Sequence, residues 1–344
     1  MLKNILVTGG AGFIGSNFIP YLLAQYPSYQ VINLDKLTYA GSLDNLAEVA
    51  SHPRYSFIQG DITDKKLVHH LFKQHDFQGV IHLAAESHVD KSIQNPTDFI
   101  KTNLEGTFIL LEAARLHWME GPGIPQKNHY TSRFLHVSTD EVYGSLGATG
   151  FFTEATPFAP NNPYSATKAG SDLLVRSYVK TYGLNAIVTH SSNNYGPKQH
   201  EEKLIPTIIR HALAQQPIPI HGNGRAIRDW LYVLDHCKGI DLAFHQGLPG
   251  EHYNLGGSNE QPNLNIAHQV CSLLDELVPL APRNSYKSLI TFVQDRPGND
   301  QRYALDTHKA ATALGWQAAE AFKTGLRKTV QWYINKYSQP GSYP

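Results

Sequence analysis

The sequence predicts an α/β fold in which a doubly wound parallel sheet is joined to a smaller, mixed C-terminal domain. Short β-rich runs alternate with longer helical patterns over the first half of the 344 residues. A glycine-rich turn separates the first strand from the first helix, and the alternation ends near residue 190. Alternating strands and helices indicate βαβ crossovers, which place helices on both faces of a parallel sheet.

Six strands are predicted in the first half of the chain. They cover residues 3–8, 30–35, 55–59, 80–83, 133–138 and 184–189. Helical patterns lie between them, over residues 13–25, 64–75, 98–118 and 163–182. Because parallel strands all end at one edge of the sheet, and ligands of such sheets bind beyond that edge, we expect the functional residues there.

Turn-forming residues become frequent beyond residue 190. They concentrate at 193–197, 216–219 and 221–224, and helical patterns return near 204–214, 235–246, 264–276 and 318–337. No low-complexity linker separates the two parts. We therefore expect a smaller, irregular second domain that shares an interface with the first.

The composition narrows the range of partners. Lys and Arg number 29, as do Asp and Glu, so a basic face for nucleic acid is not expected. No apolar run approaches the roughly 18 residues that a membrane span needs. Cys237 and Cys271 cannot form a disulfide framework, and the N-terminal apolar run is too short for a signal peptide, so we expect a cytoplasmic protein.

The eighteen histidines raise the question of a metal site. No His-Glu-x-x-His run or paired Cys/His spacing occurs, and His69, His70 and His75 lie among lysines on a polar helix face. A solvated helix face explains these histidines better than metal ligation does. We therefore expect no metal.

The glycine-rich turn carries the signal for a cofactor. Gly9, Gly12 and Gly15 have the spacing that permits a tight turn, close approach of a pyrophosphate and close packing of helix on sheet. Asp35 ends the second strand, where a carboxylate accepts hydrogen bonds from both ribose hydroxyls and favours NAD over NADP. Asp61 and Ile62, at the end of the third strand, could flank the adenine. Such turns also serve as hairpins or helix caps, but strand, glycines, helix and acid together predict a Rossmann-type dinucleotide site.

Tyr164 and Lys168 are four residues apart in the helix predicted from Pro163, for which Asn162 suits the N-cap. This spacing puts both side chains on one helix face. An ammonium beside a phenol lowers the pKa of the phenol, so Tyr164 could accept a hydroxyl proton while a hydride leaves. The alternative is an ordinary surface pair of a cation and a tyrosine.

Thr139, Asp140 and Glu141 lie at the carboxyl end of the fifth predicted strand. Two adjacent acids at this edge of the sheet are well placed for separate proton transfers. Alternatively, Thr139 or Asp140 caps a helix and Glu141 pairs with a lysine. The nearby Tyr164–Lys168 pattern and the glycine turn favour the catalytic interpretation.

These residues belong to a longer series of motifs that is similar to a known family. The motifs occupy residues 8–15 (TGGAGFIG), 83–90 (LAAESHVD), 138–144 (STDEVYG), 164–168 (YSATK), 193–197 (NNYGP), 224–230 (GRAIRDW) and 295–298 (DRPG). From residue 3 to about 305, the chain resembles the dTDP-glucose 4,6-dehydratases of the extended short-chain dehydrogenase/reductase superfamily. The glycine turn and Tyr-x-x-x-Lys are common to the superfamily, whereas the Thr-Asp-Glu run marks the dehydratases.

The resemblance implies an NAD-dependent lyase with five catalytic residues. Tyr164, assisted by Lys168 and Thr139, would deprotonate the C4 hydroxyl of a nucleotide-activated glucose as its hydride goes to NAD⁺. Glu141 would remove the C5 proton and Asp140 would protonate the departing C6 hydroxyl. Return of the hydride to C6 would give the 4-keto-6-deoxy sugar.

The resemblance also implies the remaining binding residues. The cofactor site would comprise Gly9, Gly12, Phe13, Ile14, Gly15, Asp35, Lys36, Asp61, Ile62, Ala84, Ala85, Tyr164 and Lys168. The sugar nucleotide would contact Ser87, Asn193, Lys203, Leu204, His221, Arg228, Asn263 and Arg296. His190, His221 and Asn299 depart from the usual family residues, and we expect all three near the nucleotide pocket, which leaves the choice between thymine and uracil open.

The family suggests the domain arrangement and assembly. Residues 1–190, with a return segment near 225–250, would form the NAD-binding domain, and residues 191–224 and 251–344 the sugar-nucleotide domain. Relatives usually dimerise through two helices per subunit, here those near 98–118 and 163–182, so we expect a homodimer. The alternatives are a nucleotide-sugar epimerase, a decarboxylase or a UDP-sugar 4,6-dehydratase of the same fold, and, more distantly, a non-catalytic NAD-binding protein.

Overall fold

The computed structural model describes residues 3–280, 284–295 and 297–338. Its centre is a seven-stranded sheet in which every neighbouring pair is parallel. The strands run in the order β12 (His252–Leu255), β8 (Ala186–Ser191), β7 (Arg133–Thr139), β4 (Gly79–His82), β1 (Lys3–Thr8), β2 (Tyr29–Asp35) and β3 (Tyr55–Gln59). The predicted fold class is confirmed: the strand order reverses direction on either side of β1, as in a doubly wound sheet.

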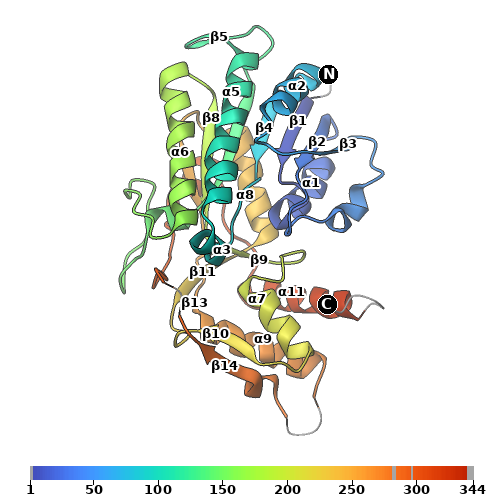
Figure 1. Ribbon diagram of the computed structural model, residues 1–344, viewed down its shortest axis with the longest axis vertical. Coiled ribbons are helices and arrows are strands. Elements are labelled where there is room, and N and C mark those ends of the chain that lie inside the picture. The colour runs from blue at the N-terminus through green and yellow to red at the C-terminus, as the bar shows by residue number, and fades with distance from the viewer. Residues whose placement is uncertain (1–2, 281–283, 296, 339–344) are drawn as a thin grey trace.

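Helices cover both faces of the sheet. Because successive side chains of a strand point to opposite faces, Ile5 and Val7 of β1 pack on one side and Leu6 on the other. The first face is covered by α1 (Phe13–Gln25) and α8 (Val233–Gln246). The second face is covered by α2 (Lys65–His75), α5 (Thr107–Trp118) and α6 (Pro163–Tyr182) (Figure 1).

The helix predicted over 98–118 is interrupted. It consists of α4 (Thr97–Phe99), a π-helical stretch (Ile100–Gly106) and α5. The wider π turn positions the Asn103 side chain so that its Nδ2 donates to Thr167 Oγ1 on α6 at 2.9 Å and to the Glu86 carbonyl at 3.1 Å. A sequence pattern of helical period does not distinguish such a turn from a regular helix.

The second half of the chain builds a separate core below the sheet in Figure 1. Helices α7 (Leu204–Leu213), α9 (Asn263–Leu277) and α11 (Phe322–Tyr337) pack with two small sheets. One pairs β10 (Ile218–His221) with β14 (Ile290–Val293), and the other joins β9 (Asn193–Tyr195), β11 (Ile227–Tyr232) and β13 (Glu260–Pro262). The region 216–224, expected to consist of turns, therefore contains the strand β10. The strand β12 of the large sheet lies just beyond the return segment that was expected near 225–250.

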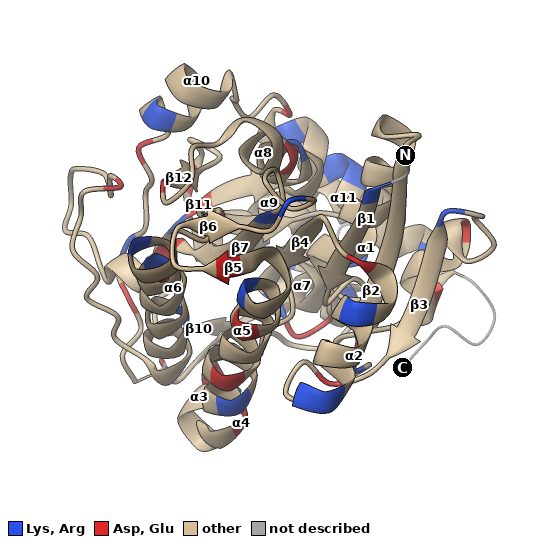
Figure 2. Cartoon of the chain, turned by 90° about the horizontal axis from the view of Figure 1, so that it is seen from above, with Lys and Arg blue, Asp and Glu red and all other residues tan. Residues whose placement is uncertain are grey.

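The remaining elements are short. They are β5 (Met119–Gly121), β6 (Ile124–Pro125), α3 (Val89–Gln94), α10 (His308–Leu314) and the 3₁₀ turns η1 (Leu43–Val49), η3 (Asp140–Tyr143) and η4 (Tyr286–Leu289). Acidic and basic residues are interspersed over these elements and the larger ones (Figure 2). Within the described ranges, every helix is too short or too polar to cross a bilayer.

Candidate active site

A cavity lies where the strands of the large sheet end. Its walls come from the turns after β1, β2, β3, β4 and β7 and from the start of α6. All thirteen residues expected at the cofactor line it: Gly9, Gly12, Phe13, Ile14, Gly15, Asp35, Lys36, Asp61, Ile62, Ala84, Ala85, Tyr164 and Lys168. Thr139, Asp140 and Glu141 line the same cavity, so the structure brings the expected cofactor and catalytic residues together.

The glycine turn has the geometry of an anion cradle. Gly9 has φ +72°, and a Cβ there would lie 2.6 Å from Ala84 Cα, so a side chain is excluded. Gly12 is the N-cap of α1, where no side chain caps the helix and the first turn contains no acid. The first-turn N–H groups of α1 therefore face the cavity with the positive end of the helix dipole, which fits a dinucleotide pyrophosphate.

The acid at the end of β2 is fixed by backbone groups. Asp35 accepts hydrogen bonds from Ala11 N at 2.9 Å and from Leu37 N at 2.8 Å. Burial raises the pKa of Asp35, and these two hydrogen bonds oppose that rise. The neighbouring Lys36 is paired with Asp61 at 2.8 Å, so its charge is balanced locally. These residues fit the ribose end of NAD.

The acid pair follows β7 on the 3₁₀ turn η3. Thr139 Oγ1 accepts a hydrogen bond from Glu141 N at 3.3 Å, so Thr139 does cap this turn. Asp140 is 2% exposed, and its Oδ2 has no hydrogen-bond partner among the described residues. Burial, with smaller contributions from Glu141 and Asp229, raises the pKa of Asp140 well above its ordinary value. Burial also raises the pKa of Glu141, whereas Arg228 and Lys203 lower it.

Tyr164 and Lys168 are buried in the first turns of α6. Asn162 accepts a hydrogen bond from Ser165 N at 2.9 Å and Pro163 is the first helical residue, which confirms the predicted cap. With exposures of 8% and 4%, Tyr164 and Lys168 are not a surface pair. Lys168 Nζ donates to the Val137 carbonyl at 2.8 Å.

The expected lowering of the phenol pKa is wrong for this structure. Burial raises the pKa of Tyr164 and the Glu141 charge adds to that effect, while a hydrogen bond with Thr139 opposes it. The physical reason is that the phenol is desolvated and faces a carboxylate, whereas the ammonium of Lys168 is directed toward β7.

A second cavity adjoins the first and extends into the C-terminal half. Seven of the eight residues expected at the sugar nucleotide line it: Ser87, Asn193, Lys203, Leu204, His221, Arg228 and Asn263. The eighth, Arg296, lies outside the described residues. Ser87, Glu141, Asn193 and Lys203 line both cavities, so the two share a wall at Glu141.

The second cavity offers unused polar atoms. Asn193 Oδ1, Asn263 Oδ1 and Trp230 Nε1 are buried without a hydrogen-bond partner in the part of the chain that the structure describes. Buried polar groups in proteins are normally paired, so these atoms fit a polar ligand. Arg228 supplies charge: its Nη2 donates to Asn299 Oδ1 at 3.0 Å, and its guanidinium lies 4.4 Å from the centre of the Tyr303 ring.

Comparisons with known proteins identify the family. The model of the family described as GDP-mannose 4,6 dehydratase matches residues 6–329. The dTDP-glucose 4,6-dehydratase of Neisseria meningitidis serogroup B is 52% identical over 337 residues, which cover 97% of this chain and 94% of that protein. The chain belongs to the dTDP-glucose 4,6-dehydratase family.

Solved structures of dTDP-glucose 4,6-dehydratases agree with the fold. The enzyme from Bacillus anthracis, in complex with NAD, is 44% identical with a TM-score of 0.85, and the match covers 97% of each chain. The enzyme from Streptomyces venezuelae, with NAD and dTDP bound, is 43% identical with a TM-score of 0.88, covering 97% of this chain and 98% of that one.

The departures from the usual dehydratase residues fall in two places. His221 and Asn299 line the second cavity, as expected. His190 does not line it, and the expectation that it lies near the nucleotide pocket is wrong. His190 is on β8, 1% exposed, with Nε2 2.9 Å from Asp172 Oδ2. All residues of β8 are buried, so its sequence has no alternation of polar and apolar residues that would show which face of the sheet His190 points to.

Several residues of this dehydratase site were not anticipated. Tyr303 and Trp230 line the second cavity, and Asn162 Nδ2 lies 3.4 Å from Glu141 Oε2 in addition to capping α6. His136 contacts Lys168, and the charge of Asp172 acts on it. The position of Asp172, four residues after Lys168, was a usable signal because i and i+4 share a helix face.

Proposed function

We propose that this protein converts dTDP-glucose to the 4-keto-6-deoxy sugar nucleotide by NAD-dependent loss of water. The observation that carries the proposal is the acid pair Asp140–Glu141, which lines one cavity with Tyr164 and Lys168, and Glu141 lies where that cavity meets the second. An epimerase has no elimination to catalyse and does not need these two acids. Family membership, with NAD bound in relatives of known structure, supports the same reaction.

The reaction needs an activated hydrogen at C5. Neither the C5 proton nor the C6 hydroxyl of glucose is reactive, but a ketone at C4 makes the C5 proton acidic because it is then α to a carbonyl. Bound at the glycine turn, NAD⁺ would accept the hydride from C4, and the reduced cofactor would return it to C6. The other bond changes are loss of the C6 oxygen as water and return of a proton to C5 when the hydride reaches C6, and the acids and bases of the chain would carry the protons for both.

The first proton transfer is assigned to Tyr164. Its hydroxyl would accept the C4 hydroxyl proton as the hydride departs, and the Thr139 hydroxyl, which hydrogen-bonds the phenol, stabilises the phenolate. Lys168 is the buried cation on the same face of α6. Its ammonium would stabilise the negative charge that develops on Tyr164.

The elimination is assigned to the acid pair, with different tasks for the two carboxyls. The pKa of Asp140 is raised well above its ordinary value by burial, so Asp140 can carry the proton that the leaving C6 hydroxyl requires. Burial also raises the pKa of Glu141, but Arg228 and Lys203 oppose that rise by stabilising the carboxylate, which fits Glu141 for removing the C5 proton. Two neighbouring carboxyls with different environments suit an acid and a base.

The second cavity would hold the nucleotide diphosphate. Arg228 and Lys203 provide positive charge for the diphosphate, and the unpaired oxygens of Asn193 and Asn263 provide acceptors for N–H or O–H groups of the base and sugars. Arg296, with Ser87, Leu204 and His221, completes the set of proposed substrate contacts. The cofactor contacts are proposed for the thirteen residues that line the first cavity.

The domain division, assembly and location form part of the proposal. Residues 1–190 with a return segment would bind NAD, and the remainder would bind the sugar nucleotide. Phe108 and Leu116 on α5 and Leu173 on α6 are 42%, 53% and 54% exposed, an apolar surface that supports dimerisation through these two helices. A cytoplasmic location agrees with the two free cysteines, both of which are buried.

Product analysis tests the reaction. Purified protein with NAD⁺ is mixed with dTDP-glucose and, separately, with UDP-glucose, and the products are identified by mass spectrometry and NMR. We expect a 4-keto-6-deoxy product that is lighter than the substrate by one water, formed faster from dTDP-glucose. A 4-epimer, or turnover of the UDP sugar alone, would contradict the proposal.

A further inference from the structure

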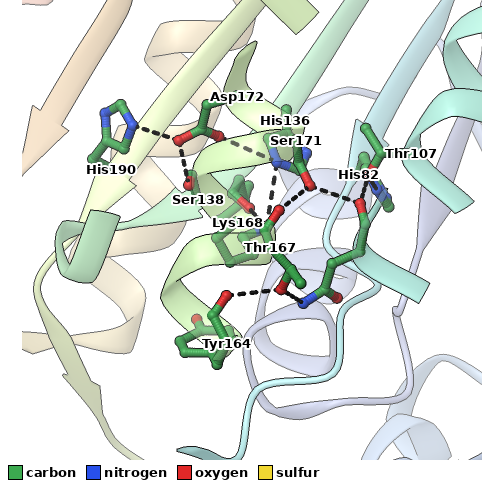
Figure 3. Close-up of polar contacts among 12 residues, drawn as sticks. His82, Thr107, His136, Ser138, Tyr164, Thr167, Lys168, Ser171, Asp172 and His190 are labelled. Atoms are coloured by element: carbon green, nitrogen blue, oxygen red, sulfur yellow. Dashed lines mark hydrogen bonds and ion pairs between the residues drawn. The ribbon is translucent and has the colours of Figure 1, made fainter. Parts of the chain in front are cut away.

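A buried group of polar side chains lies behind Tyr164 and Lys168. Lys168 Nζ is 3.3 Å from His136 Nε2, and His136 Nε2 is 3.4 Å from Asp172 Oδ1. Asp172 Oδ2 accepts a hydrogen bond from Ser138 Oγ at 2.9 Å and lies 2.9 Å from His190 Nε2 (Figure 3). All five side chains are at most 5% exposed.

The side chain of Asp172 on α6 is contacted by residues of two strands. Ser138 and His136 come from β7, and His190 comes from β8. His190 is itself anchored, since its Nδ1 lies 3.2 Å from the Tyr143 hydroxyl, which donates to Asn254 Oδ1 on β12. A carboxylate with donors at Oδ2 has its other oxygen directed toward the His136–Lys168 pair.

The remaining groups that face Lys168 carry no charge. His82 on β4 lies between two hydroxyls, with Nδ1 2.7 Å from Thr8 Oγ1 and Nε2 2.9 Å from Thr107 Oγ1. Thr107 donates its own proton to the Asn103 carbonyl, so it accepts from His82, and Thr8 then donates to Nδ1 of a neutral ring.

Burial keeps both histidines uncharged. It lowers the pKa of His82 to about 3 and lowers that of His136 well below its ordinary value, and Lys168 depresses both further. Tyr164 faces Lys168 along α6 and its burial raises the pKa of the phenol. Among the described residues, Asp172 is therefore the negative charge that acts on Lys168.

We propose that Asp172 is a positioning residue for the reaction, whose buried negative charge beside His136 keeps Lys168 in its ammonium form. The inference rests on the proposed function, in which the Lys168 ammonium stabilises the Tyr164 phenolate. Asp172 touches neither cavity in the described part of the chain, so it acts through Lys168 and not on the substrate.

The direction of the effect follows from the charges. Burial lowers the pKa of Lys168 to about 8, and the Asp172 charge raises it. Without that charge, Lys168 loses its proton at a lower pH. The variant then lacks the ammonium at mildly alkaline pH and regains it when the pH is lowered.

The test is Asp172→Asn, which removes the charge and keeps the size of the side chain. NAD-loaded enzyme is mixed with saturating dTDP-glucose, and the rate of the first rise in reduced-nicotinamide absorbance is measured as a function of pH. We expect the alkaline limb of this rate to move down by about one to three pH units, the range for loss of an opposite charge at close distance. Near pH 8 the rate should fall at least about fivefold and recover on acidification, with KM little changed.

Ser171→Ala is the matched control. Ser171 is the adjacent, fully buried residue of α6, and its hydroxyl donates to the Asn103 and Thr167 carbonyls without facing either cavity. Loss of this contact perturbs the same helix without a change in charge, so the pH profile should keep its wild-type shape. An Asp172→Asn profile that is lowered equally at every pH would overturn the proposal.

Two further comparisons keep the test decisive. If Asp172→Asn does not fold, Asp172→Glu and Asp172→Gln are compared, and only the uncharged Gln should shift the alkaline limb; equal profiles for the two would overturn the proposal. Failure of the proposed function is recognised separately, because wild-type protein would then form no 4-keto-6-deoxy product from dTDP-glucose, whatever the pH profile of the variants.

Discussion

Asp140→Asn should raise the free energy of unfolding relative to the wild-type protein, by an amount that increases with pH. Asp140 is 2% exposed, and burial raises its pKa well above the ordinary value. Such a group contributes stability that is fully present below the unfolded-state pKa, near 3.9, and that is lost as the pH rises toward the folded-state pKa. The amide of the variant does not titrate and escapes this loss.

The expected magnitude follows from linkage. Between the unfolded-state and folded-state pKa values, the wild-type protein loses about 1.4 kcal/mol of stability per pH unit relative to Asp140→Asn. The gap should therefore widen by up to about 1.4 kcal/mol for each pH unit above the unfolded-state pKa. It should level off once the pH exceeds the folded-state pKa of Asp140.

Urea unfolding of both proteins over this pH range is the appropriate assay, because it compares free energies of unfolding at fixed temperature. Asp44→Asn, an exposed acid in η1, is the matched control and should change stability by less than about 0.5 kcal/mol at every pH. A gap between wild type and Asp140→Asn that stays constant with pH would refute the assignment of a raised pKa to this carboxyl.

Three other substitutions have distinct expected outcomes. Glu141→Gln should allow C4 oxidation but slow product formation by about 10²–10⁴, seen as persistent reduced nicotinamide; normal turnover would remove Glu141 from its role as base. Tyr164→Phe should abolish that absorbance rise in a single turnover, and a normal rise would contradict the role of the phenol. Gly9→Ala should lose NAD and stability, measured by cofactor retention and thermal melting, because φ is +72° and Ala84 leaves no room for a Cβ; a fully loaded, equally stable variant would show that the turn can adjust.

Local signals predicted the sheet and much of the site. The predicted strands and helices of the first half begin and end within two residues of the observed ones in most cases. Caps, turns and hydrophobic periodicity depend on residues that are close together in the chain. Tyr164 and Lys168 follow from helical spacing together with the Asn162–Pro163 cap. Asp35 follows from its distance to the glycine turn. These features depend on residues close together in the chain.

The surroundings of Lys168 and His190 depend on contacts between distant segments. The direction of Lys168 toward the Val137 carbonyl, and the contact of His190 with Asp172, arise where α6 packs on β7 and β8. The raised pKa of Tyr164 could not be predicted for the same reason. Its causes, burial and the nearby Glu141 charge, both arise from tertiary packing. The π turn at residues 100–106 also has no distinct sequence period.

Isotope transfer is the most direct test of the proposed reaction. dTDP-glucose carrying deuterium at C4 is incubated with purified protein and NAD⁺, and the product is examined by NMR. Oxidation at C4 followed by hydride return predicts a 4-keto-6-deoxy product with the deuterium at C6. A product that retains deuterium at C4, or one without deuterium at C6, would contradict the mechanism.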